Sequence, residues 1–78
     1  MGNYVGSYVI NALGTYGPGD GQGVANLNGN LYVKSTATLS WIHVSGGKIY
    51  IDAGPTGVVT LYHVQGDIEV ISGTTTGQ

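Results

Sequence analysis

His43 and His63 are the residues with the most versatile chemistry in this sequence. They occupy similar places in two segments, 41–46 and 61–66, which both read aromatic or apolar residues, then His-Val, then a turn with Gly. Equivalent positions on neighbouring strands could bring the two imidazoles together, and imidazole pairs bind Zn²⁺ or Ni²⁺. Polar residues that simply came with a repeat would give the same pattern. We therefore keep His43 and His63 as candidate ligands and predict no metal and no cofactor.

The carboxylates Asp52, Asp67 and Glu69 could approach one another across strands and hold Ca²⁺, which prefers several oxygen ligands. No Asp-rich loop accompanies them, so a solvated surface explains them as well. A glycosidase acid/base pair needs a deep cleft, which a chain of 78 residues is too short to build alone. No Ser or Asp forms a known catalytic motif with either histidine, and cysteine is absent. The sequence therefore predicts that the protein is not an enzyme.

Aromatic residues give the clearest sign of binding surfaces. Tyr and Trp beside Asn, Ser and Gly combine rigid contact area with adaptable hydrogen bonding, as interaction surfaces do. We expect contacts with other molecules at six of them: Tyr4, Tyr8, Tyr16, Trp41, Tyr50 and Tyr62. Ordinary half-buried strand tyrosines would account for the same residues. A carbohydrate-binding module using Trp41, Tyr32, Tyr50 or Tyr62 is an alternative.

The chain carries few charges. Charged residues make up 8% of it, against about 25% in an average soluble domain. Two basic residues cannot neutralise a run of phosphates, so nucleic acid is not expected as a partner. No run approaches about 18 apolar residues, and the N-terminus has no basic region before an apolar run. We expect no membrane-spanning helix and no secretory signal.

The elements that must position these residues are strands. Residues rich in Val, Ile and Thr alternate with glycines that interrupt any helical stripe, which predicts an all-β fold. A repeat runs through 27–33, 44–51 and 64–70, with glycines 29, 46 and 66 at corresponding places. Asn28-Gly29 is typical of a two-residue β-hairpin turn. We therefore predict three hairpins, at 24–34, 37–53 and 58–72, packed as a small antiparallel sandwich or barrel.

A second interpretation of the same repeat is a short β-helix. A spacing of 17 to 20 residues between the glycines fits one coil, three coils would be about the minimum, and bare ends would invite stacking. Around the repeat body 24–72 we place an N-terminal strand with a glycine-rich arm in 1–23 and a polar tail in 73–78. The tail holds three consecutive threonines. Because neighbours alternate faces on a strand, that run does not predict an array for ice.

Assembly is the function that these features favour. Strand edges are normally protected by Lys or Pro, and this chain has two of each. A small core without disulfides gains most by burial against other copies. We predict a homo-oligomer, a trimer or a larger lattice. The expected function is a self-assembling structural protein, either a capsid decoration or a fibre component of a phage-like virion. A subunit of an extracellular β-rich filament is the alternative within this class, and both place the protein on a virion or an outer surface.

Overall fold

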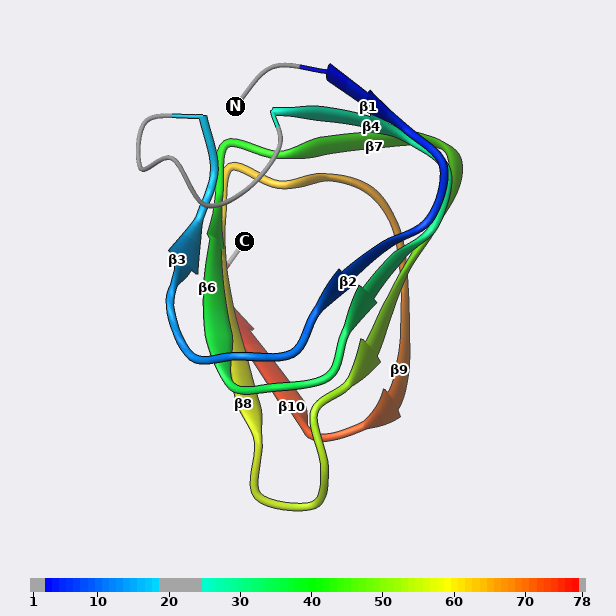
Figure 1. Cartoon of the computed structure of the whole chain (residues 1–78). Coiled ribbons are helices and arrows are strands. Elements are labelled where there is room, and N and C mark those ends of the chain that lie inside the picture. The colour runs from blue at the N-terminus through cyan, green and yellow to red at the C-terminus, as the bar shows by residue number, and fades with distance from the viewer. Residues whose placement is uncertain (1–2, 19–24, 78) are drawn as a thin grey trace.

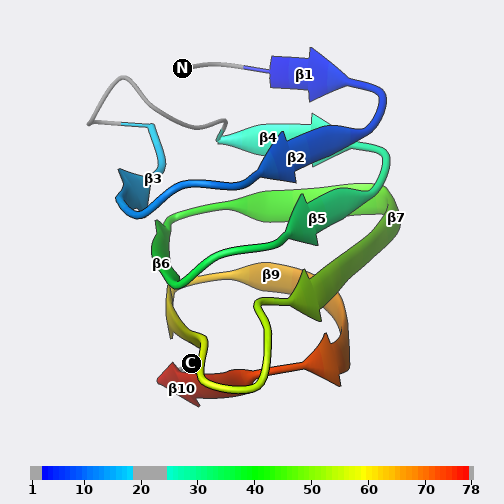
Figure 2. The same ribbon diagram turned by 60° about the horizontal axis from the view of Figure 1, so that its bottom comes forward.

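The computed structural model describes residues 3–18 and 25–77, which form a β-solenoid of about four turns. In this part of the chain no helix could cross a lipid bilayer. The coils wind around one axis, which Figure 1 views end on and Figure 2 views from a tilted side. The strands in chain order are β1 (Asn3–Val5), β2 (Tyr8–Ile10), β3 (Thr15–Tyr16), β4 (Asn26–Asn28), β5 (Leu31–Val33), β6 (Ala37–Ser40), β7 (His43–Asp52), β8 (Val58–Tyr62), β9 (Gln65–Ser72) and β10 (Thr74–Gly77).

Three walls enclose the axis. The first wall contains β1, β4 and the starts of β7 and β9, where Asn3, Asn26, His43 and Gln65 lie in one register column. The second wall contains β2, β5 and the later parts of β7 and β9. The third wall contains β3, β6, β8 and β10. Every pairing is parallel, so each strand bonds to the corresponding strand of the next coil and not to its neighbour in sequence.

The predicted antiparallel packing of hairpins 24–34, 37–53 and 58–72 is therefore wrong, and the short β-helix is supported. The repeat itself was correctly recognised, since Leu31, Ile49 and Ile68 share one register column. Asn28-Gly29 forms a corner between β4 and β5, at which the chain bends without reversing. Both a hairpin turn and this corner need positive φ at glycine, here 152° at Gly29. Local sequence does not distinguish the two.

The corner between the first and second walls requires glycine for a second reason. The backbones of successive coils approach closely there, and Gly6 N–H donates to Asn28 O while Gly29 N–H donates to Ser45 O, both at 2.9 Å. A Cβ atom at Gly29 would collide with the carbonyl oxygen of Gly6. The glycines of the repeat thus mark where coil contacts coil.

The core fills the space between the walls. Every buried side chain among the described residues is hydrophobic, and the core consists of Ile10, Tyr16, Leu27, Leu31, Val33, Ala37, Leu39, Ile42, Val44, Ile49, Ile51, Val59 and Leu61. Inward and outward residues alternate along each wall, as strand geometry demands. Leu39 and Ile42 both point inward because the chain turns a corner at Trp41, whose φ is 56°.

A polar contact joins three coils at the end of the second wall. The Ser72 hydroxyl donates to Asp52 Oδ1 at 2.6 Å and accepts from Gly54 N–H at 3.0 Å. Lys34 Nζ lies 3.6 Å from Asp52 Oδ2. The Ser72 hydrogen bond is the main cause that lowers the pKa of Asp52 below its ordinary value; desolvation opposes it, and the charge and hydrogen bond of Lys34 lower the pKa further.

Replacing Ile49 by Ala tests the inward column. Ile49 is fully buried, so the free energy of unfolding should fall by about 2–5 kcal/mol through lost burial and a residual cavity. The control is Ile71→Ala, which removes the same atoms from a side chain that is 59% exposed and should cost about 0.5 kcal/mol or less. Urea denaturation followed by circular dichroism in dilute solution measures both. Equal losses would contradict the assignment of Ile49 to the core.

Ser72→Ala tests the contact with Asp52. Since the folded-state pKa of Asp52 lies below 3.8, its ionised form stabilises the fold above that pH, and this contribution disappears as the pH falls through the folded-state value. Removing the hydroxyl should raise the pKa of Asp52 toward 3.8 and lower the stability at neutral pH. An NMR titration of the Asp52 carboxyl in both proteins measures the shift. An unchanged pKa would show that the hydroxyl does not hold the carboxylate.

Candidate functional site

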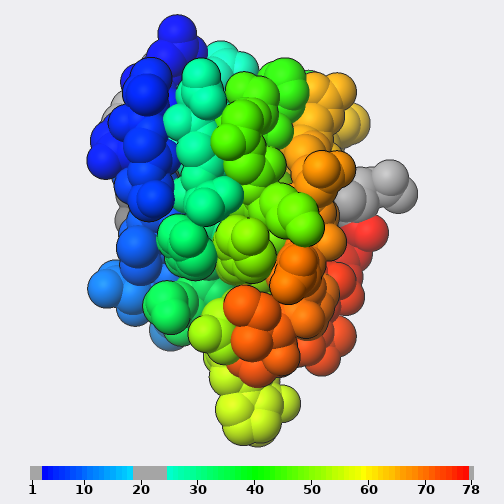
Figure 3. All heavy atoms as spheres, turned by 90° about the vertical axis from the view of Figure 1, so that its right-hand side faces the viewer, coloured from blue at the N-terminus to red at the C-terminus, as the bar shows by residue number. Residues whose placement is uncertain are grey.

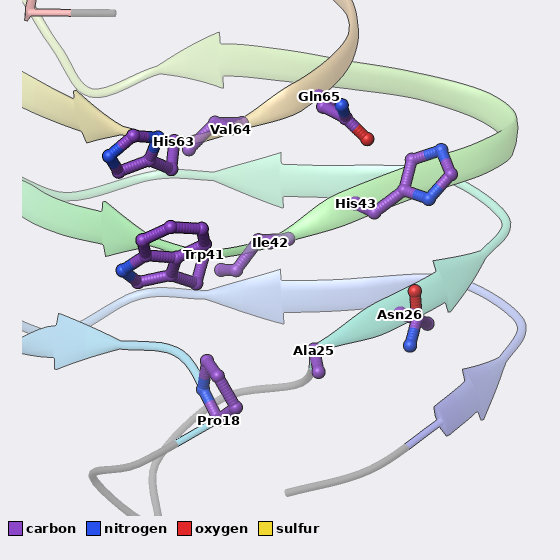
Figure 4. Close-up of a pocket in the computed structure, with 9 residues that line it drawn as sticks. All are labelled: Pro18, Ala25, Asn26, Trp41, Ile42, His43, His63, Val64 and Gln65. Atoms are coloured by element: carbon purple, nitrogen blue, oxygen red, sulfur yellow. The ribbon is translucent and has the colours of Figure 1, made fainter.

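A groove of about 780 Å³ follows the corner between the third and first walls. It crosses several coils, and its walls come from equivalent positions of successive coils (Figure 4). The lining residues are Pro18, Ala25, Asn26, Trp41, Ile42, His43, His63, Val64 and Gln65. Both histidines line this groove.

One side of the groove is lined by a column of rings. The Trp41 and His63 rings are stacked with centroids 4.0 Å apart and planes 17° from parallel. Pro18 lies next in the same column, on the other side of Trp41 (Figure 4). The Tyr62 ring packs edge-on against His63 at 4.3 Å. The flat face that Trp41 turns toward His63 is therefore occupied within the protein.

The two stacked residues share an unusual backbone. Trp41 has φ 56° and His63 has φ 52°, and they are the non-glycine residues with positive φ in the described chain. Such a conformation costs about 1–2 kcal/mol for a residue with a Cβ atom. The Trp41 N–H donates to Tyr62 O and the Gln65 N–H to Ile42 O, both at 2.9 Å, so backbone bonds between coils hold the corner. Stacking of the rings, worth about 0.5–1.5 kcal/mol per pair, offsets part of the strain.

The opposite side of the groove is polar. Asn26, His43 and Gln65 follow one another in the register column that begins with Asn3, and all are exposed. Asn26 Nδ2 donates to Asn3 Oδ1 at 3.1 Å, which links the first two coils. Sequence reasoning missed Asn26 and Gln65. A signal was present, because Asn3, Asn26 and His43 each stand three residues before a corner glycine.

The groove can offer hydrogen bonds and ring edges but little else. None of its lining residues is Asp, Glu, Lys or Arg, and none is Ser, Thr or Tyr. His43 and His63 do not share a register column, since His43 pairs with Asn26 and Gln65 while His63 stacks on Trp41. No group of three or more metal-ligating side chains occurs in residues 3–18 and 25–77. The arrangement has the parts of neither a nucleophilic centre nor a closed metal site.

The other aromatic residues proposed as contact residues have different environments. Tyr4 packs edge-on against Tyr8 at 5.2 Å, at the N-terminal end of the solenoid. Tyr16 is 8% exposed, and its hydroxyl donates to Ala12 O at 2.8 Å. Tyr50 stacks on Tyr32 at 5.3 Å, so the inner faces of that pair are covered. The glycine-rich arm predicted within 1–23 lies partly outside the described residues.

His63→Ala tests the strained stack. It removes the ring while keeping a Cβ atom at positive φ, so stability should fall by about 0.5–1.5 kcal/mol. His63→Gly removes the same ring but relaxes the backbone, and it should be more stable than His63→Ala by about 1 kcal/mol. His43→Ala is the matched control and should change stability by about 0.5 kcal/mol or less. Urea denaturation measures all three, and equal stability of the Ala and Gly variants would contradict the strained backbone.

Comparisons with known proteins found no match for this chain. No protein-family model matches the chain, no curated protein matches it, and no solved structure matches it. The function therefore has to be argued from the geometry of the solenoid itself.

Proposed function

We propose that this protein is a structural subunit that assembles by stacking its solenoid end to end with other copies. The observation that carries the proposal is the exposure of inward-facing residues in the last coil. Ile68 and Val70 continue the columns of Ile49 and Ile51. Ile49 and Ile51 are fully buried, whereas Ile68 is 40% and Val70 49% exposed. Residues of the same register column are thus buried in the third coil and partly exposed in the last coil.

The edges at both ends support the proposal. Within the described strands, β9 bonds only to β7 and β10 only to β8, so their far edges have unpaired backbone groups. At the other end β1, β2 and β3 bond only to β4, β5 and β6. Val5 and Val9 are exposed there. Unprotected strand edges are templates for pairing with another chain.

The two ends are complementary in direction and in chemistry. Because every strand pairing is parallel, a second copy placed beyond β9 and β10 would present β1, β2 and β3 in the same direction. Ile68 would then meet Tyr8, and Val70 would meet Ile10, which continues the inward columns. Gln65 would meet Asn3, and Thr76 would meet Thr15, which continues two outward columns of like residues. Successive coils appear as adjacent bands in Figure 3, and stacking would add more bands.

Charge does not oppose this contact. The described charged residues all lie on the second wall or at its margins: Lys34, Lys48, Asp52, Asp67 and Glu69. Lys48 Nζ is 3.4 Å from Glu69 Oε1, so the last coil's glutamate is paired within the chain. The loop Gly54–Gly57 projects sideways from the solenoid and leaves both ends open (Figure 1).

The proposed contact joins different surfaces of two copies and does not close on itself. A contact of this kind produces an open fibre. Among the roles expected from the sequence, a virion fibre component or an extracellular filament subunit therefore fits better than a capsid decoration. A non-enzymatic role in such an assembly accords with a groove that lacks catalytic side chains.

Ile68→Glu tests the proposal. The change places a charge on the open end without removing a buried residue, so it should leave the fold intact and prevent assembly. Val58→Glu is the control, because Val58 is an exposed valine on a side wall and its charge should not touch the contact. We expect wild-type and Val58→Glu chains to form concentration-dependent, unbranched fibres, observed by sedimentation and electron microscopy. A folded wild-type monomer at every concentration, or fibres of Ile68→Glu, would overturn the proposal.

A further inference from the structure

The outer surface of the third wall has an unusual composition. Seven of the eight threonines of the sequence stand on this wall or at its entry, and all but Thr75 belong to its outer surface: Thr15, Thr36, Thr38, Thr60, Thr74 and Thr76. Four of them form one register column, with Thr15 beside Thr38, Thr38 beside Thr60, and Thr60 beside Thr76. The run 74–76 does alternate faces, as strand geometry requires. Its outward members complete columns that other coils begin.

The outward columns of the other two walls do not hold one residue type in all four coils. The column on the first wall reads Asn3, Asn26, His43 and Gln65. The column on the second wall reads Val9, Tyr32, Tyr50 and Glu69. Threonine suits any exposed strand, but that preference would act on all three walls. The presence of threonine at one position in all four coils therefore needs a cause specific to the third wall.

The third wall is also the most regular. Its three pairings run without a register shift, whereas the pairing of β7 with β9 shifts at two places. Adjacent strands of a sheet lie about 4.8 Å apart, and residues two apart on one strand lie about 6.7 Å apart. Outward side chains on this wall thus form a two-dimensional grid. A second row runs beside the threonine column and includes Thr36, Val58 and Thr74.

The hydroxyls of Thr38, Thr60 and Thr76 are available to a ligand. No hydrogen bond to the described protein engages the hydroxyls of Thr38, Thr60 or Thr76, while Thr36 Oγ1 accepts from Val58 N–H at 3.1 Å. A shallow trough of about 310 Å³ lies along the rows, between Leu13, Thr36 and Val58 on one side and the threonine column on the other. The outward strand residues of this wall include no charged side chain.

We propose that the third wall binds the surface of ice. A grid of hydroxyl and methyl groups, without charges, can hold water at spacings close to those of the ice lattice, and the trough gives the first waters a place between the rows. The ligand must itself be a regular lattice, since the ligand-facing groups repeat at fixed intervals and are chemically the same. This inference does not rest on end-to-end assembly, although stacking would lengthen the threonine column.

Measurements at the surface of ice test the inference. Purified full chain should shape single ice crystals, slow recrystallisation and lower the freezing point below the melting point. Thr38→Lys and Thr60→Lys, each of which places a charged chain in the grid, should reduce all three effects to the level of buffer. Ser45→Lys is the matched control, because Ser45 is exposed on a strand of the first wall, and it should retain the wild-type effects. Circular dichroism checks that every variant is folded.

Two further variants separate the contribution of the threonine hydroxyl from that of end-to-end assembly. Thr60→Val keeps the shape of the side chain and removes the hydroxyl, so a partial loss is expected. Ile68→Glu, which should prevent fibres, is expected to retain activity per chain, so failure of the fibre proposal and failure of this one are distinguishable. Wild-type protein without effect on ice would overturn the inference. An equal loss in Ser45→Lys, or binding to crystalline cellulose with no effect on ice, would overturn it as well.

Discussion

The structure depends on one constraint: a coil of this solenoid covers its inward side chains and pairs both of its strand edges only when another coil lies on each side of it. The backbone hydrogen bonds of the sheets run between coils, and the inward side chains of one coil are covered by those of the next. Coils two and three satisfy the constraint, and their inward residues are fully buried. The first and last coils satisfy it on one side only. The exposed Ile68 and Val70 are therefore a consequence of the architecture and not an irregularity of the sequence.

The same constraint acts on the corners. Where the backbone of one coil passes close to that of the next, a side chain would obstruct the stacking, and glycine stands at Gly29 and Gly47. The corner beside the groove solves the problem differently. Trp41 and His63 accept a positive φ and direct their rings along the axis, where the rings stack and so take part in the contact between coils. The corner between the first and second walls thus excludes side chains. At the corner beside the groove, side chains form the contact between coils.

The sequence predicted the all-β fold, the repeat and its glycine punctuation, because these depend on local propensity and pattern. It did not decide between hairpins and coils. Asn28-Gly29 supplies a positive-φ glycine in either case, and the partner of each strand is set by contacts between distant residues. The groove was found in part, through His43 and His63, but their pairing was misplaced. The residue equivalent to His63 is Trp41, which becomes evident only when the corner is counted as one position per coil. The threonine grid was missed because Thr15, Thr38, Thr60 and Thr76 are unevenly spaced along the chain.

The scarcity of charge connects the two proposals. In a monomer with random placement, five charges would fall on any wall or end. Here the described ones gather on the second wall and its margins, where Lys34 pairs with Asp52 and Lys48 with Glu69. The strands of the third wall and residues 3–18 of the first coil carry no charged side chain. A contact on the third wall can therefore form without desolvating a charge, and a contact along the axis would meet few charges. Because the ends and the third wall are geometrically independent, copies stacked end to end would keep every threonine column exposed. End-to-end assembly would then lengthen the threonine grid coil by coil and would not cover it.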